Sequence, residues 1–303
     1  MNLIISTIDQ GLIWSLLAVG LFITFRILDF PDMTVEGSFP LGAVTSIMLI
    51  QQGYSSEFSL LIAFIYGALA GFVTAFLYTK LKIPVLLSGI LTMTGLYSVN
   101  LRILGKANMS LTKPQNIFNK YGMDKLPVNF NGIILGIILI TIIIGLLMLF
   151  LNTEKGQALI VTGDNEIMAS SIGINTTRMK FIGLMSSNGI VALTGGLIAQ
   201  QNGFADVNMG IGVIVIGLSA IIIGEVIYSD VPLNIRIITI VIGSIVYRLI
   251  LMVVLQLGFN PNDLKLISAI ILSLCLALPT IREQFIHTLK RGVKSNATST
   301  RAK

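Results

Sequence analysis

The residue types that usually carry catalysis or hold metals are scarce in this chain. Cys275 and His287 are its only cysteine and histidine, one in an apolar run and the other in a basic segment. Metal centres and thiol nucleophiles need such residues in groups at motif spacing. The chain also lacks a Gly-xxxx-Gly-Lys-Ser/Thr phosphate-binding loop. We therefore expect no metal site, no nucleotide site and no enzyme activity of its own.

Charge is concentrated in one short stretch, RILDFPDMTVEGSFPLGA at residues 26–43, which separates two apolar runs. Asp32 and Glu36 lie there among Pro and Gly residues that interrupt helices. One interpretation is a solvated turn whose carboxylates sit near a helix N-terminus. The other is the lining of a gate or vestibule, and the sequence leaves both open.

Other polar residues fall in or beside apolar runs, where ionisable and hydrogen-bonding groups usually face the protein interior. Thr94, Tyr97 and Ser98 share one side of a helix and could line a path, although Ser and Thr also bond back to helix carbonyls. Asp206 and Asn208 are candidates for receptor contacts or an outer gate. Arg248 is a candidate for an internal pair, a substrate carboxylate contact or a snorkelling side chain.

The amino-acid composition indicates which class of protein contains these polar residues. Only 11% of residues are charged, 54% are hydrophobic and the mean hydropathy is +0.89, whereas soluble domains carry roughly 25% charged residues. We expect an all-α polytopic membrane protein with a single domain over 1–281 and a basic tail over 282–303. Nine apolar runs predict nine transmembrane helices. They cover 10–28, 39–52, 58–79, 84–103, 131–151, 179–199, 211–228, 233–256 and 264–281.

The distribution of Lys and Arg predicts the orientation. Placing the C-terminus in the cytoplasm puts thirteen of the 20 basic residues on that side and six outside, as the positive-inside rule favours. Nine spans then place the N-terminus outside. The net charge of +6 is thus a topology signal, and we expect no nucleic-acid partner. Glu225 and Arg236, which flank a short cytoplasmic turn, are expected to form an ion pair.

Two stretches are weakly alike. FPDMTVEGSFPLGA at 30–43 and FADVNMGIGVIVIG at 204–217 both begin Phe-x-Asp and place a glycine before a new apolar run. The predicted topology puts them on opposite sides of the membrane, as in an inverted-topology repeat. Chance similarity is the alternative.

The loop at 152–178 is polar but carries signals of structure. From Asp164 or Asn165 to Ile172 it reads as a short helix, with Asp164 as a good N-cap, Glu166 near the positive helix end and Gly173 just beyond the last turn. On a loop that contacts no other protein, apolar side chains such as Ile167 and Met168 would be exposed to water at a cost in free energy. They predict a surface on which another protein docks.

The run GDNEIMASSIGINTTRMKF resembles the cytoplasmic coupling loop of ABC-importer permeases of the branched-chain amino acid and ribose type. The matching positions are Gly163, Asn165, Ala169, Gly173, Ile174 and Lys180. LTGGLIAQQNGFADVNMGIG and the N-terminal apolar segment resemble other parts of the same family, so the resemblance covers most of the chain. DFPDMTVEGSF is most similar to permeases paired with lipoprotein receptors for aromatic amino acids such as tryptophan or tyrosine.

The resemblance implies a permease subunit in the cell membrane that moves a small solute, an amino acid, by alternating access. A separate ATPase would hold ATP and magnesium, and further partners would be a second permease copy and an extracytoplasmic substrate-binding protein or lipoprotein. It also implies a set of ATPase-coupling residues, namely Gly163, Asp164, Asn165, Glu166, Met168, Ala169, Gly173 and Ile174. The alternatives are an ABC permease for a sugar or nucleoside, or a self-sufficient secondary transporter.

Overall fold

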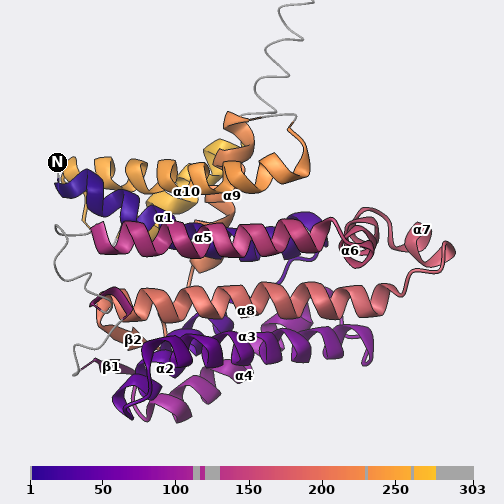
Figure 1. Ribbon diagram of the computed structural model, residues 1–303, viewed down its shortest axis with the longest axis horizontal. Helices are drawn as coiled ribbons and strands as arrows, with labels where there is room; N and C mark the ends of the chain where they lie inside the picture. The colour runs from indigo at the N-terminus through magenta and orange to yellow at the C-terminus, as the bar shows by residue number, and fades with distance from the viewer. Residues whose placement is uncertain (1, 112–116, 120–129, 229–230, 261–262, 278–303) are drawn as a thin grey trace, which may run out of the picture.

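A computed structural model describes residues 2–111, 117–119, 130–228, 231–260 and 263–277 (Figure 1). The chain is mostly helical, and the predicted tail over 282–303 lies outside the described residues. The helices are α1 (Asn2–Phe22) with the π-helical turn η1 (Ile23–Ile27), α2 (Val35–Gln51), α3 (Ser56–Thr79), α4 (Val85–Leu104), η2 (Ile117–Asn119), α5 (Phe130–Leu151), α6 (Glu154–Asp164), α7 (Glu166–Ser171), α8 (Thr176–Asn202), α9 (Val213–Ile227), α10 (Leu233–Gln256) and Leu264–Ala277.

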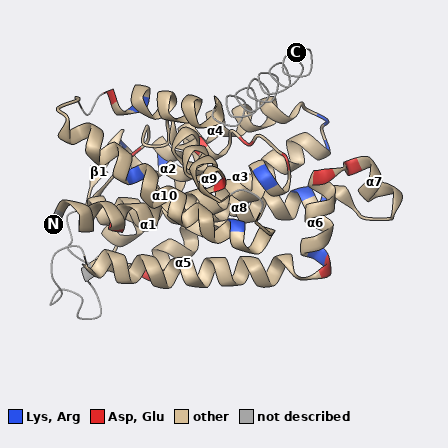
Figure 2. Cartoon of the chain, turned by 90° about the horizontal axis from the view of Figure 1, so that it is seen from above, with Lys and Arg blue, Asp and Glu red and all other residues tan. Residues whose placement is uncertain are grey.

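The long helices run along a common direction, and connections gather at the two ends of the bundle (Figure 1). The N-terminus and the strands β1 (Asn108–Ser110) and β2 (Phe204–Asp206) lie at one end, while α6 and α7 extend from the other. Charged residues are sparse along the helices and include a group on α6 and around α7 (Figure 2). This separation of apolar length and polar ends is what a lipid environment requires.

The centre of the bundle is α8, which is buried along most of its length between α2 and α3. Glycines bring these backbones together. A Cβ added at Gly42 of α2 would lie 1.8 Å from the carbonyl oxygen of Ala192, and one at Gly71 of α3 would lie 2.2 Å from that of Leu184. Small residues at such crossings permit the close packing on which membrane helices rely.

Five helices in the described part of the chain are long and apolar enough to cross a membrane: Leu3–Ile27, Ser56–Thr79, Phe130–Leu151, Thr176–Asn202 and Leu233–Gln256. The other four predicted spans also coincide with helices, but these are shorter or less apolar. The prediction of a multi-span helical protein is confirmed, while the count of nine spans is not.

The charged stretch at 26–43 separates α1 from α2, as its Pro and Gly content predicts. The chain leaves α1 through the π-helical turn η1, and Asp29 adopts a positive φ of 49°. The helix α2 then starts at Val35, four residues before the predicted start, so Pro40 lies inside it. Proline has no N–H, so the Glu36 carbonyl lacks its helical donor at this position.

Three local features differ from or extend the prediction. The loop at 152–178 contains the additional helix α6, and β1 pairs antiparallel with β2, bringing Asn108 opposite Asp206. Glu225 pairs with Arg26, so the predicted pair with Arg236 is wrong. The pairing with Arg26 depends on the return of α9 to the end of α1, which local sequence does not reveal.

Candidate functional site

The first candidate site is α7, a two-turn helix between α6 and the start of α8. Its N-cap is Asn165, whose Oδ1 accepts a hydrogen bond from the Met168 N–H at 2.9 Å. Asp164 instead ends α6, so the prediction of Asp164 as the cap is wrong. Gly173 follows the helix with φ of +87°, a conformation that glycine adopts without strain.

The outer face of α7 is apolar and open. Ile167 is 80% exposed, and Met168 and Ile172 are also exposed, while Ala169 is buried beneath them. The Ile174 N–H closes the turn by donating to the Ala169 carbonyl at 3.0 Å. Gly163 packs against the end of α1, where an added Cβ would meet the Ile27 carbonyl oxygen at 1.9 Å. The helix is thus held from behind and presents apolar side chains outward.

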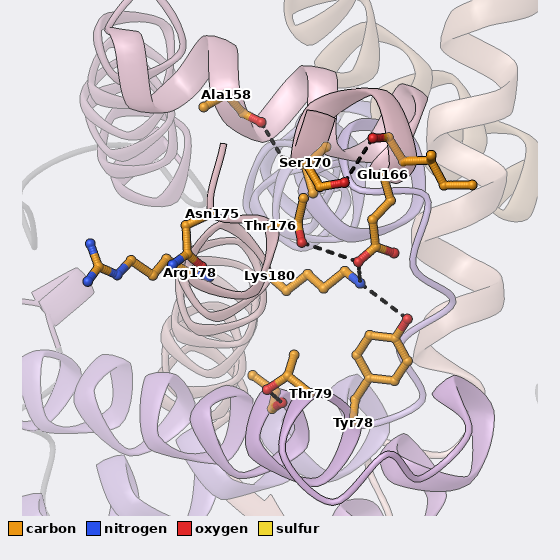
Figure 3. Close-up of polar contacts among 12 residues, drawn as sticks. Tyr78, Thr79, Ala158, Glu166, Ser170, Asn175, Thr176, Arg178 and Lys180 are labelled. Atoms are coloured by element: carbon orange, nitrogen blue, oxygen red, sulfur yellow. Dashed lines mark hydrogen bonds and ion pairs between the residues drawn. The ribbon is translucent and has the colours of Figure 1, made fainter. Parts of the chain in front are cut away.

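A polar network joins α7 to the bundle (Figure 3). Lys180 of α8 donates to Glu166 Oε1 at 2.5 Å and to the Tyr78 hydroxyl of α3 at 3.2 Å. Its side chain is 10% exposed, whereas that of Glu166 is 49% exposed. The Thr176 hydroxyl also donates to Glu166 Oε1, at 3.3 Å. Sequence reasoning placed Lys180 in the loop pattern but missed Tyr78, because 102 residues separate the two.

Asp32 is fully buried in the connection between η1 and α2. Its Oδ1 accepts the Thr34 N–H at 2.9 Å, and its Oδ2 accepts from the Asn188 amide of α8 at 2.6 Å. Asn188 Oδ1 in turn accepts from the Ser38 hydroxyl at 2.6 Å. Burial raises the pKa of the Asp32 carboxyl, and these hydrogen bonds oppose the shift. The interpretation of Asp32 as part of a solvated turn is wrong.

The second candidate site is a cavity of about 260 Å³ between α2, α4 and the turn that precedes α9. Four of the predicted path residues line it, namely Glu36, Thr94, Tyr97 and Asn208. Glu36 Oε1 accepts the Gly212 N–H at 3.0 Å, at the start of α9. A carboxylate at a helix N-terminus is stabilised by the exposed N–H groups there. Asn100, from the same polar stretch of α4 as Thr94 and Tyr97, also lines this cavity and is fully buried.

Comparison with known proteins decides the class. Residues 3–277 match the family described as branched-chain amino acid transport system / permease component. The chain belongs to this family. The tyrosine transport system permease protein of Clostridioides difficile (strain R20291) is 43% identical over 277 residues, which cover 91% of each chain. The family resemblance inferred from the sequence is thereby confirmed, and the chain is a permease of the ABC-importer type in a cell membrane.

Two other relatives have lower sequence identity to the permease, and the name of one states no function. Uncharacterized protein RP368 of Rickettsia prowazekii (strain Madrid E) is 34% identical over 281 residues, 91% of this chain and 98% of that protein. The autoinducer 2 import system permease protein LsrC of Yersinia pseudotuberculosis (strain IP 31758) is 28% identical over 183 residues, 60% of this chain and 50% of that one.

A solved structure supports the fold of the permease. PsaBC from Streptococcus pneumoniae in complex with Fab matches with a TM-score of 0.50 at 12% identity, covering 90% of this chain and 89% of that chain. At this identity the match concerns the arrangement of helices alone.

Besides Asp32, three predicted path residues of the permease lie away from the cavity. Ser98 is exposed on α4, and Asp206 accepts the Asn208 N–H at 2.6 Å in the turn after β2. Arg248 of α10 packs over Trp14 of α1, with 4.3 Å between the guanidinium carbon and the ring centroid. Its Nη1 donates to Gln10 Oε1 at 3.4 Å. This packing favours the internal role for Arg248 over the snorkelling one.

The two weakly similar stretches of the permease share a local geometry. Asp32 and Asp206 each accept a hydrogen bond from the backbone N–H two residues later, just before α2 and α9 begin. The starts of these helices meet, because Glu36 in the first turn of α2 contacts Gly212 before α9. The inverted repeat stays a prediction, and it would place interrupted helices at these two helix starts.

Proposed function

We propose that this permease imports an amino acid, of the aromatic class that includes tyrosine, and that a separate ATPase docks on α7 to drive alternating access. The observation that carries the proposal is α7 itself. It offers exposed Ile167, Met168 and Ile172 to a partner, while the ion pair of Glu166 with Lys180 ties it to α8. An apolar helical face on a polar connection fits a groove of another protein.

The solute class rests on relatedness. The C. difficile protein that is 43% identical carries tyrosine in its name, whereas the permease named for autoinducer 2 matches at 28% over part of the chain. We therefore prefer an amino acid to a sugar or nucleoside. Membership of the permease family likewise leads us to propose an extracytoplasmic substrate-binding protein and a second permease copy as partners.

The orientation follows from the same proposal. If the ATPase binds α7, that end of the bundle faces the cytoplasm, and the N-terminus at the other end faces outward (Figure 1). The excess of basic residues on the proposed cytoplasmic side agrees with this orientation.

The test uses the permease expressed with its candidate ATPase and binding protein in membranes. We expect Ile167→Asp and Met168→Asp to abolish co-purification of the ATPase and ATP-dependent uptake of tyrosine, since each places a charge in an apolar contact. Leu257→Asp is the matched control, because Leu257 is similarly exposed but lies at the far end of α10. Unchanged co-purification and uptake in both α7 variants would refute docking. Uptake without any ATPase would instead favour a self-sufficient transporter.

A further inference from the structure

The cavity beside Glu36 is built around hydrogen-bond acceptors. It lies where α2 and α9 begin, and Thr94, Tyr97 and Asn208 in its wall are exposed, so a solute can reach it. Glu36 Oε1 is engaged by the Gly212 N–H at 3.0 Å. One backbone N–H supplies no countercharge to a carboxylate.

Asn100 supplies a second acceptor. Its Nδ2 donates to the Gly37 carbonyl oxygen at 3.3 Å, and its buried Oδ1 accepts no hydrogen bond from the residues that the structure describes. The orientation of the amide follows from this contact, because turning it over would place two oxygens against each other. A buried carbonyl oxygen without a donor is costly. The wall therefore lacks a donor at the place where Asn100 Oδ1 lies.

The charge of the cavity wall indicates whether a bound group should be positive or negative. In the part of the chain that the structure describes, the cavity lining contains Glu36 and no Lys, Arg or His. An anionic group would meet the Glu36 carboxylate with no compensating cation. A group with a positive charge and several N–H donors satisfies both Glu36 and Asn100, and a primary ammonium has three such donors.

A metal ion is a weaker match than an ammonium. The described residues contain no group of three or more His, Cys, Asp or Glu able to hold one, whereas stable sites for hard cations use several oxygen ligands including carboxylates. The volume of about 260 Å³ is smaller than most pockets that enclose a whole drug-sized ligand. It suits the head group of a solute whose remainder lies outside the cavity, beside the exposed Tyr97.

We propose that the cavity between Glu36 and Asn100 binds the ammonium group of the transported solute. This rests on the proposed function as an amino acid permease and adds a position for one end of the solute. Glu36 provides the countercharge, Asn100 accepts one N–H, and the exposed Tyr97 ring can face the cation.

The experiment measures binding to the purified full-length permease in lipid nanodiscs by saturation-transfer NMR. The probes are L-tyrosine, tyramine, which lacks the carboxylate, and 3-(4-hydroxyphenyl)propionate, which lacks the ammonium. We expect both amines to bind roughly tenfold or more tightly than the propionate, the scale of a charge-assisted hydrogen bond. Glu36→Gln keeps an acceptor for the Gly212 N–H and is expected to fold, yet to lose this preference. Asn100→Leu should also lose it.

Thr141→Val, at an exposed position of α5, is the matched control and should bind as the wild type does. Equal binding of tyramine and the propionate, no binding of either amine, or an undiminished preference in Glu36→Gln would each overturn the proposal. The proposed function fails separately, through absence of ATP-dependent uptake by the complete importer. If uptake is present and Glu36→Gln keeps the preference for the amines, the ammonium site is refuted while the importer function stands.

Discussion

Removing the ion pair between Glu166 and Lys180 tests whether it holds α7 against the bundle. The pair joins a residue in the first turn of α7 to one near the start of α8, with Nζ and Oε1 2.5 Å apart. We consider Glu166→Ala, Lys180→Met and the double variant. Arg178→Met is the control, because Arg178 is an exposed cation on the same helix whose side chain points away from Glu166 (Figure 3).

The magnitude follows from the unequal burial of the partners. Exposed ion pairs contribute up to about 1 kcal/mol, whereas breaking a fully buried pair costs about 3–5 kcal/mol. Here Lys180 is nearly buried but keeps the Tyr78 hydroxyl, and Glu166 is half exposed. We therefore expect each single change to release α7 by about 1–2 kcal/mol, a roughly 5- to 30-fold change in the population of its detached state.

Hydrogen exchange of the peptide covering residues 164–176 measures that population. Its amides are protected by bonds such as Ala169 N–H to the Asn165 carbonyl at 2.9 Å, which exchange only when α7 opens. Both single variants should speed exchange by the stated factor, and the double variant should add little, since one interaction is lost only once. A change below about twofold, or fully additive effects, would refute the role of the pair.

Three further changes address the bundle, each read from thermal unfolding of the purified permease in detergent. Asn188→Leu should destabilise it by about 3 kcal/mol or more, because Asp32 stays buried without its amide donor; Tm equal to the wild type would contradict this. Gly42→Val should cost about 1–3 kcal/mol or more, because the new side chain meets the Ala192 carbonyl; unchanged Tm would show that α2 can move away. Arg26→Gln should cost about 1 kcal/mol or less, since its pair with Glu225 is partly exposed, and a larger loss would reveal a stronger role.

The features predicted correctly from sequence depend on neighbouring residues. Apolar runs gave the positions of the long helices, and the residues around 165–173 gave α7, because capping and turn preferences act within a few positions. The error between Asp164 and Asn165 arose because both are good caps, and the end of α6 decides between them. The start of α2 was misplaced because Pro40 was read as a boundary, although α2 tolerates it inside.

The features that the sequence did not reveal depend on contacts between distant segments. The Asp32–Asn188 bond spans 156 positions, and the Glu36–Gly212 bond spans 176. Neither residue type nor spacing marks such partners in a single sequence. The place of Asn100 beside the cavity could not be told from the sequence, because it depends on the turn before α9 that packs against α4. The best available signal was the Phe-x-Asp similarity, which pointed to two helix starts that the structure brings into contact.

These distant contacts connect α7 to the cavity beside Glu36 through α8. Lys180, which binds Glu166, and Asn188, which binds Asp32, lie eight residues apart on the continuous helix α8, about 12 Å along its axis. A rigid helix displaced at Lys180 carries Asn188 with it. Asn188 holds both Asp32 and Ser38, on either side of the start of α2, and Glu36 lies between them. If an ATPase docks on α7 as proposed, α8 would carry that displacement toward Glu36, because Lys180 and Asn188 lie on one continuous helix.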